Sequence, residues 1–138
     1  MTDRVLVPMD DSEQAAKALR KAIEAFPDAE ITVLHVSHVP TQNVDELQVI
    51  TGGNWEQYKN ERAGAVFERA TEIADEYGVE VENAIAEGEV ARTITEHADG
   101  YDWLFIGSHG REGVARILLG SVAERVVRRA PIPVTVIR

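Results

Sequence analysis

The sequence contains no cysteine, which excludes a disulfide framework, a thiolate metal site and a cysteine nucleophile. Lysine is scarce: the chain has three lysines (Lys17, Lys21 and Lys59) and eleven arginines. The apolar runs are far shorter than the roughly 20 residues of a membrane-spanning helix, and no charged and then apolar leader opens the chain. We therefore expect a soluble, cytoplasmic protein.

Positive charge as a whole is in short supply. The 14 Lys and Arg residues face 24 Asp and Glu residues, which gives a formal net charge of −10. Duplex nucleic acid and anionic membranes are held by clustered basic residues, so neither is an expected partner. The 138 residues match the prior of about 150 residues per domain, and we expect one domain over residues 1–138.

The excess of acidic residues has two interpretations, and the charge is unevenly distributed along the chain. It can be a solvated surface that keeps the protein soluble, or an adaptation to a salt-rich cytoplasm that screens self-repulsion. Residues 1–106 carry 8 basic and 22 acidic side chains, whereas residues 107–138 carry 6 basic and 2 acidic ones. The locally positive end indicates that an anionic ligand, or an acidic surface of the same fold, lies there.

Strand and helix patterns alternate along the chain. Short apolar runs predict strands over 4–8, 31–36, 79–86, 103–106 and 132–137. Apolar residues at helical spacing predict helices after Ser12, over 55–77, over 89–97 and through Val126. Five strands separated by four helices predict a parallel sheet with right-handed crossovers and helices on both faces.

The stretch 37–54 fits neither pattern. It contains Pro40, Asn43 and Gly52-Gly53, which are typical of turns. We expect it to be mostly loop, and so long a loop is a candidate lid or partner contact.

Ligands of such sheets bind outside the carboxyl ends of the strands, where the strand order reverses. Gly107-Ser108-His109-Gly110 follows a buried strand there, and its glycines would let a phosphate approach backbone N–H groups. A glycine within a helix costs about 1 kcal/mol relative to alanine, so one alternative is that the last helix begins near Gly120-Ser121. The other is that these glycines only make a tight turn and a close packing contact.

The complete motif of the C-terminal segment is a more specific signal than the glycine spacing alone. The pattern Gly107-x2-Gly110-x9-Gly120-Ser121 lies within a C-terminal segment that resembles the universal stress protein family, specifically its ATP-binding branch. The resemblance extends over the whole chain and includes V-L-V-P-M-D-D-S near the start, V-L-H-V, and Y-D-W-L-F-I-G before the glycine turn.

The resemblance implies a fold, a ligand and an assembly. The fold is a three-layer, doubly wound α/β fold with a five-stranded parallel sheet in the order 3-2-1-4-5, the Rossmann-like adenine nucleotide alpha hydrolase fold. The ligand is ATP with Mg²⁺ or Mn²⁺, and the assembly is a homodimer through Ile132, Val134 and Val136 of the last strand. Pro131 and Pro133 independently suit an edge strand, because proline donates no ladder hydrogen bond.

The resemblance also assigns roles to residues. Asp10 would contact the nucleoside, the main chain of Val36 would meet the adenine, and the glycines with Ser121 would hold ribose and phosphates. Met9 stands where the family often has a small polar residue. The expected nucleotide-binding set is Pro8, Met9, Asp10, Val36, Gly107, Gly110, Arg111, Gly120, Ser121 and Val122.

Other conspicuous residues have plainer interpretations. We expect His35 to be a hydrogen-bonded core residue, His38 and His97 to be solvated, and His109 either to touch the ligand or to order its turn. Asp11 favours a helix N-terminus. Arg111 and Arg116 could reach phosphate. The remaining residues are expected on a solvated or interface face (Arg125, Arg128 and Arg129) or in packing contacts (Trp55, Tyr58 and Trp103).

Three functions are open at this point. The favoured one is a nucleotide-sensing stress-response module, and the others are a slow ATPase or nucleotidyl-transfer relative and a nucleotide-free interaction protein. The chain has no H-I-G-H, S-G-G-x-D-S or G-x-x-x-x-G-K-[ST] spelling, which disfavours an enzyme. No catalytic residue is assigned, and we expect Gly120→Val to abolish nucleotide binding with little change in fold.

If the acidity is an adaptation to salt, the protein gains stability as salt screens its carboxylates. The expected result is a thermal unfolding midpoint that is higher in molar KCl than in low-salt buffer. A midpoint that does not rise with KCl would leave only the solvated-surface interpretation.

Overall fold

A computed structural model of the chain describes residues 2–39, 42–109 and 119–138. In chain order its elements are β1 (Arg4–Pro8), α1 (Glu13–Ala25), β2 (Glu30–Ser37), α2 (Val44–Thr51), α3 (Trp55–Glu76), β3 (Glu82–Glu87), α4 (Val90–His97), β4 (Trp103–Gly107), α5 (Ser121–Arg129) and β5 (Val134–Ile137). The strands and helices alternate along the sequence as expected, except that two helices, α2 and α3, follow β2.

The five strands form one parallel sheet in the order β3-β2-β1-β4-β5. This confirms the fold class and the strand order that the resemblance implied. The order reverses between β1 and β4, because the chain first builds outward to β3 and then returns to the other side of β1. A crevice therefore opens at the carboxyl ends of β1 and β4, the place where ligands bind in open α/β sheets.

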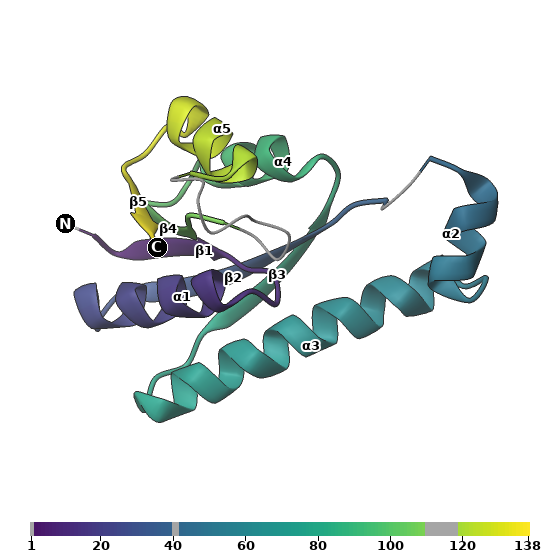
Figure 1. Cartoon of the computed structure of the whole chain (residues 1–138). Coiled ribbons are helices and arrows are strands. Elements are labelled where there is room, and N and C mark those ends of the chain that lie inside the picture. Colours follow the sequence, from purple (N-terminus) through teal and green to yellow (C-terminus); the bar gives the residue numbers. More distant parts are fainter. Residues whose placement is uncertain (1, 40–41, 110–118) are drawn as a thin grey trace.

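Helices cover both faces of the sheet, with α1 and α3 on one side and α4 and α5 on the other (Figure 1). The central strands are buried on both faces, which is why their sequences are continuously apolar. Helix α1 presents four alanines together with Leu19 and Ile23 at helical spacing, and this face is buried against β1, β2 and β4. None of the described helices has the length and apolar content needed to cross a membrane.

The prediction of a loop over 37–54 was wrong for its second half, which forms α2. The Asn43 side chain caps this helix by accepting hydrogen bonds from the N–H groups of Asp45 and Glu46, and Gly52 ends it in the left-handed conformation (φ 65°). Two of the turn-forming residues noted in the sequence, Asn43 and Gly52, are thus helix caps, and Pro40 lies outside the described residues. Helix α2 buries none of its residues, and Figure 1 shows it beyond the end of α3, away from the sheet.

Smaller differences occur at element ends. Strand β3 begins at Glu82 rather than at 79, and β5 begins at Val134, after Pro133. Helix α5 begins at Ser121 with Gly120 as its N-cap, which confirms the alternative of a late helix start.

Gly107, the last residue of β4, lies against the backbone at the start of α1. A Cβ atom at this position would stand 2.8 Å from the carbonyl carbon of Gln14 and 3.0 Å from the nitrogen of Ala15. Because both atoms belong to the backbone, neither can move aside cheaply. Glycine at 107 is therefore required by packing, whether or not a ligand is present.

We predict that Gly107→Ala lowers the free energy of unfolding by about 1–3 kcal/mol, the usual cost of overpacking. The matched control is Gly64→Ala within α3, where an added Cβ meets nothing within 4 Å and alanine stabilises the helix by up to about 1 kcal/mol. Chemical denaturation of both variants measures the difference. A Gly107→Ala protein as stable as the Gly64→Ala protein would contradict the packing argument.

Candidate functional site

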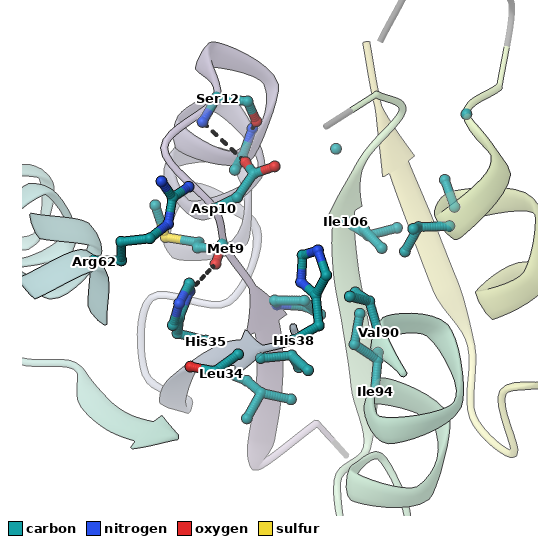
Figure 2. Close-up of a pocket in the computed structure, with 18 of the residues that line it drawn as sticks. Met9, Asp10, Ser12, Leu34, His35, His38, Arg62, Val90, Ile94 and Ile106 are labelled. Carbon is teal, nitrogen blue, oxygen red and sulfur yellow. Dashed lines mark hydrogen bonds between the residues drawn. The ribbon is translucent and has the colours of Figure 1, made fainter. Parts of the chain in front are cut away.

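A cavity of about 930 Å³ opens at the carboxyl ends of β1, β2 and β4, where the strand order reverses (Figure 2). Its floor is formed by the ends of these strands. Apolar residues of α4 line one side, and the first half of α3 lines the other. The volume is in the range of small-molecule sites.

The cavity collects the residues that the sequence singled out from distant parts of the chain. Gly110 and Arg111 lie outside the described residues. The other eight members of the expected set all line the cavity: Pro8, Met9, Asp10, Val36, Gly107, Gly120, Ser121 and Val122.

The N-terminus of α5 opens into this cavity. Side chains of Ser12, Asn43, Asn54 and Glu89 cap the four preceding helices, whereas the N-cap of α5 is Gly120, which has no side chain. No side chain of the described residues caps the start of α5, and the N–H dipoles of its first turn make this end of the helix electropositive.

A short backbone contact holds that helix end in place. The N–H of Gly120 donates to the carbonyl oxygen of Ser108 over 2.6 Å, and a Cβ on Gly120 would come within 2.9 Å of the same oxygen. The expectation that Gly120→Val leaves the fold almost unchanged is therefore wrong, because valine would push α5 away from the turn after β4. This substitution cannot separate a loss of phosphate binding from a local displacement.

The turn after β4 carries a serine and histidine pair. Ser108 is 1% exposed, and its Oγ shares a hydrogen bond of 3.0 Å with Nδ1 of His109. This bond orders the turn and fixes the imidazole ring. The other ring nitrogen, Nε2, is buried and has no hydrogen-bond partner among the described residues, although burying an unpaired polar atom is costly.

Asp10 lies at the first turn beyond β1. Its Oδ1 accepts a hydrogen bond of 2.9 Å from the N–H of Ser12, and Ser12 in turn caps α1 through the N–H of Ala15. The buried Met9 is tied to β2, since its N–H donates to the carbonyl of Leu34. These bonds place the half-buried Asp10 on the cavity wall (Figure 2).

His35 is a core residue, as predicted. It is 8% exposed, and its Nδ1 lies 3.2 Å from the carbonyl oxygen of Met9, which can only accept, so Nδ1 carries the proton. Burial lowers the pKa of His35, the positive charge of Arg62 lowers it further, and the bond to Met9 acts in the opposite direction. His35 is therefore neutral at pH 7.

The two histidines expected in solvent differ. His38 is exposed and borders the cavity, which confirms its prediction. His97 is half-buried, and its ring stacks on Tyr101 with centroids 6.2 Å apart. The prediction of a solvated His97 therefore holds only in part, because the short α4–β4 connection brings Tyr101 back against the helix end.

Helix α3 contributes a cavity wall that the sequence reasoning missed. Trp55, Tyr58, Lys59 and Arg62 all line the cavity. They recur at helical spacing on one face of α3, and the Trp55 and Tyr58 rings are stacked with centroids 5.9 Å apart. The spacing was a usable signal, but the aromatic residues were interpreted only as packing, and Arg62 was not singled out.

The arginines of α5 lie at the protein surface. Arg125 of α5 pairs with Glu89 of α4 at 3.1 Å, and Arg128 pairs with Glu124 at 3.0 Å. Their prediction as solvated residues is confirmed, and Arg111 and Arg116 lie outside the described residues. Over residues 2–39, 42–109 and 119–138, no group of three or more His, Asp or Glu side chains could hold a metal ion.

Comparison with known proteins agrees with this architecture. The model of the universal stress protein family matches residues 1–138. The universal stress protein YxiE of Bacillus subtilis is 32% identical over 148 aligned residues, with full coverage of both chains. Among solved structures, the universal stress protein UspA from Lactobacillus plantarum superimposes with a TM-score of 0.81 at 25% identity, covering 99% of this chain and 98% of its own.

A further solved structure, the universal stress protein from Archaeoglobus fulgidus in complex with dAMP, has a TM-score of 0.69 at 23% identity, covering 100% of this chain and 98% of its own. At that identity the likeness concerns the fold. The match over the whole sequence, the strand order and the crevice at the reversal point agree with one another, and the chain belongs to the universal stress protein family.

Proposed function

We propose that this protein binds an adenine nucleotide, namely ATP, in the cavity and acts as a dimeric nucleotide-sensing module of the stress response. The observation that carries the proposal is the N-terminus of α5, which lacks a side-chain cap and opens into the cavity at the reversal point of the sheet. A helix N-terminus in that position is suited to phosphate.

The phosphates would occupy the side formed by β4 and α5. The N–H groups of Ser121, Val122 and Ala123, together with the Ser121 hydroxyl, supply donors there. The buried Nε2 of His109 gains a partner when an oxygen-rich group binds beside it. This site recognises an anion mainly through backbone dipoles, which an acid-rich protein can provide without a cluster of lysines.

The base and ribose would lie deeper along the sheet edge. An apolar surface of Leu34, Val36, Val90, Ile94 and Ile106 gives a flat ring a dry environment, and Figure 2 shows several of these residues gathered opposite α3. The resemblance assigns the adenine to the main chain of Val36 and the nucleoside to Asp10, and both residues border this part of the cavity. The relative solved with dAMP supports the use of this fold for an adenine nucleotide.

Mg²⁺ or Mn²⁺ would enter with the phosphates. The described residues offer no cluster of metal ligands, so phosphate oxygens and water would form most of the coordination sphere, as magnesium prefers. When bound, such an ion neutralises phosphate charge.

Sensing is favoured over hydrolysis. Ser108, which stands beside a histidine as nucleophilic serines do, is buried and bonded to Nδ1 of that histidine, so its hydroxyl is not presented to a ligand. Slow ATP hydrolysis stays the alternative activity.

The homodimer would form through β5, which is an edge of the sheet. In the parallel register Leu104 lies opposite Val134, and its N–H donates to the carbonyl of Pro133 rather than to Val134. The N–H and C=O groups of Val134 and Val136 therefore point away from β4. Their side chains pack on the core beneath α4 and α5. A second copy would therefore add to the sheet through backbone hydrogen bonds rather than through the side chains of this strand.

The nucleotide proposal predicts that protein purified without added nucleotide, then denatured, releases an adenine nucleotide identifiable by mass spectrometry. Stripped protein should bind ATP in calorimetry, and Ser121→Ala should weaken this binding by several-fold, because one hydroxyl donor is lost. Thermal unfolding of the ligand-free variant serves as the folding control. A stripped, folded wild-type protein that binds no ATP would overturn the proposal.

The dimer proposal predicts a mass of two chains at micromolar concentration in light scattering. Val136→Pro removes an outward N–H without breaking a bond to β4, and we expect a monomeric mass for it. Val136→Thr keeps the N–H and should stay dimeric. A monomeric wild-type protein, or a Val136→Pro protein that still dimerises, contradicts pairing through β5.

A further inference from the structure

Arg62 is an unusual arginine in this chain. It projects from α3 to the cavity and is half-buried, and Figure 2 shows it across the cavity from Val90 and Ile94. Its one polar contact among the described residues is a long bond of 3.4 Å from Nη1 to the hydroxyl of Tyr58. No carboxylate of the described residues lies within ion-pair distance of its guanidinium.

The other cations of α3 are neutralised within the protein. Lys59 pairs with Glu56 at 3.0 Å and with Glu87 at 3.3 Å, and Arg69 pairs with Glu72 at 3.7 Å. In a chain with 24 acidic residues, a half-buried arginine that contacts Tyr58 and forms no ion pair with a described carboxylate keeps its charge available. Partial burial of an unpaired charge is unfavourable unless a partner arrives.

Aromatic packing holds Arg62 in this position. Its guanidinium carbon lies 5.6 Å from the centre of the Tyr58 ring, and Tyr58 is in turn stacked on Trp55. A guanidinium held over a ring keeps most of its N–H donors directed elsewhere, and their planar fork matches two phosphate oxygens. The fork therefore borders the cavity with donors to spare and a positive charge.

We propose that Arg62 is a specificity-determining residue that binds the phosphate chain of the nucleotide from the α3 wall, facing the N-terminus of α5. This inference rests on the proposed nucleotide function and deepens it. The α5 side recognises phosphate through backbone dipoles, and Arg62 adds a full charge, so the site favours a nucleotide over a nucleoside by more than its helix N-terminus alone would give.

The test compares adenosine with ATP in calorimetry on stripped, full-length protein. We expect Arg62→Gln to weaken ATP binding by about tenfold or more, the usual loss when a charged hydrogen bond is removed, and to change adenosine binding by less than about twofold. Arg62→Lys keeps the charge without the fork and should give an intermediate loss.

The matched control is Arg69→Gln, which makes the same substitution and the same change in net charge on the same helix, away from the cavity. It should leave ATP binding within about twofold of the wild type, and thermal unfolding should show that both variants are folded. Equal weakening by the two variants would mean a long-range field effect, and equal loss of adenosine and ATP would mean a role in shaping the base pocket. Either result, or unchanged ATP binding in Arg62→Gln, overturns the inference.

The failure of the proposed function has a different signature. A wild-type protein that binds neither adenosine nor ATP refutes nucleotide binding and the role of Arg62 together. A wild-type protein that binds ATP, with Arg62→Gln binding it equally well, refutes only the role of Arg62.

Discussion

The site depends on one close backbone contact, between the N–H of Gly120 and the carbonyl of Ser108. It sets the start of α5 directly over the end of β4 and aims the first turn of the helix at the reversal point of the sheet. A side chain at 120 would open this contact. Gly107 plays the equivalent part on the other face, where β4 meets α1. The two glycines thus fix one strand end against a helix on each face.

This arrangement explains how a protein with a large negative net charge can have a crevice suited to an anion. A chain with a net charge of −10 would repel a polyanion at long range. The anionic ligand proposed above would meet helix N–H groups, a His109 nitrogen that has no hydrogen-bond partner among the described residues, and Arg62, which forms no ion pair with a described carboxylate. Recognition built from directed donors does not require a basic surface, so the acidic exterior and an anion-binding crevice can coexist.

Much of the architecture could be predicted from the sequence. The apolar strand runs and the periodicity of α1 and α3 report burial directly, because parallel strands and amphipathic helices repeat with different periods. The short α2 could not be predicted in this way, since it buries nothing and is defined only by its caps. Of the eight predicted site residues that line the cavity, five lie at or beside strand ends, whose positions the topology determines, and the other three begin α5 (Gly120, Ser121 and Val122).

Residues on a helix beside the site are harder to predict. Arg62 reaches the cavity because α3 extends past the strand ends, and only the three-dimensional arrangement shows that no described carboxylate pairs with it. Likewise, the locally positive C-terminal segment suggested phosphate contacts, whereas Arg125 and Arg128 pair with glutamates on the surface. Net charge along a sequence does not say which charges are already neutralised.

The two edges of the sheet differ in a way that limits growth. Strand β3 begins and ends with exposed glutamates, Glu82 and Glu87, and charged edge residues discourage further strand pairing. Strand β5 carries only uncharged residues. Another strand can therefore pair with β5 but is discouraged from pairing with β3. When two copies pair through β5, neither copy has a second edge that favours further pairing. The asymmetry favours a closed pair over an open-ended fibre.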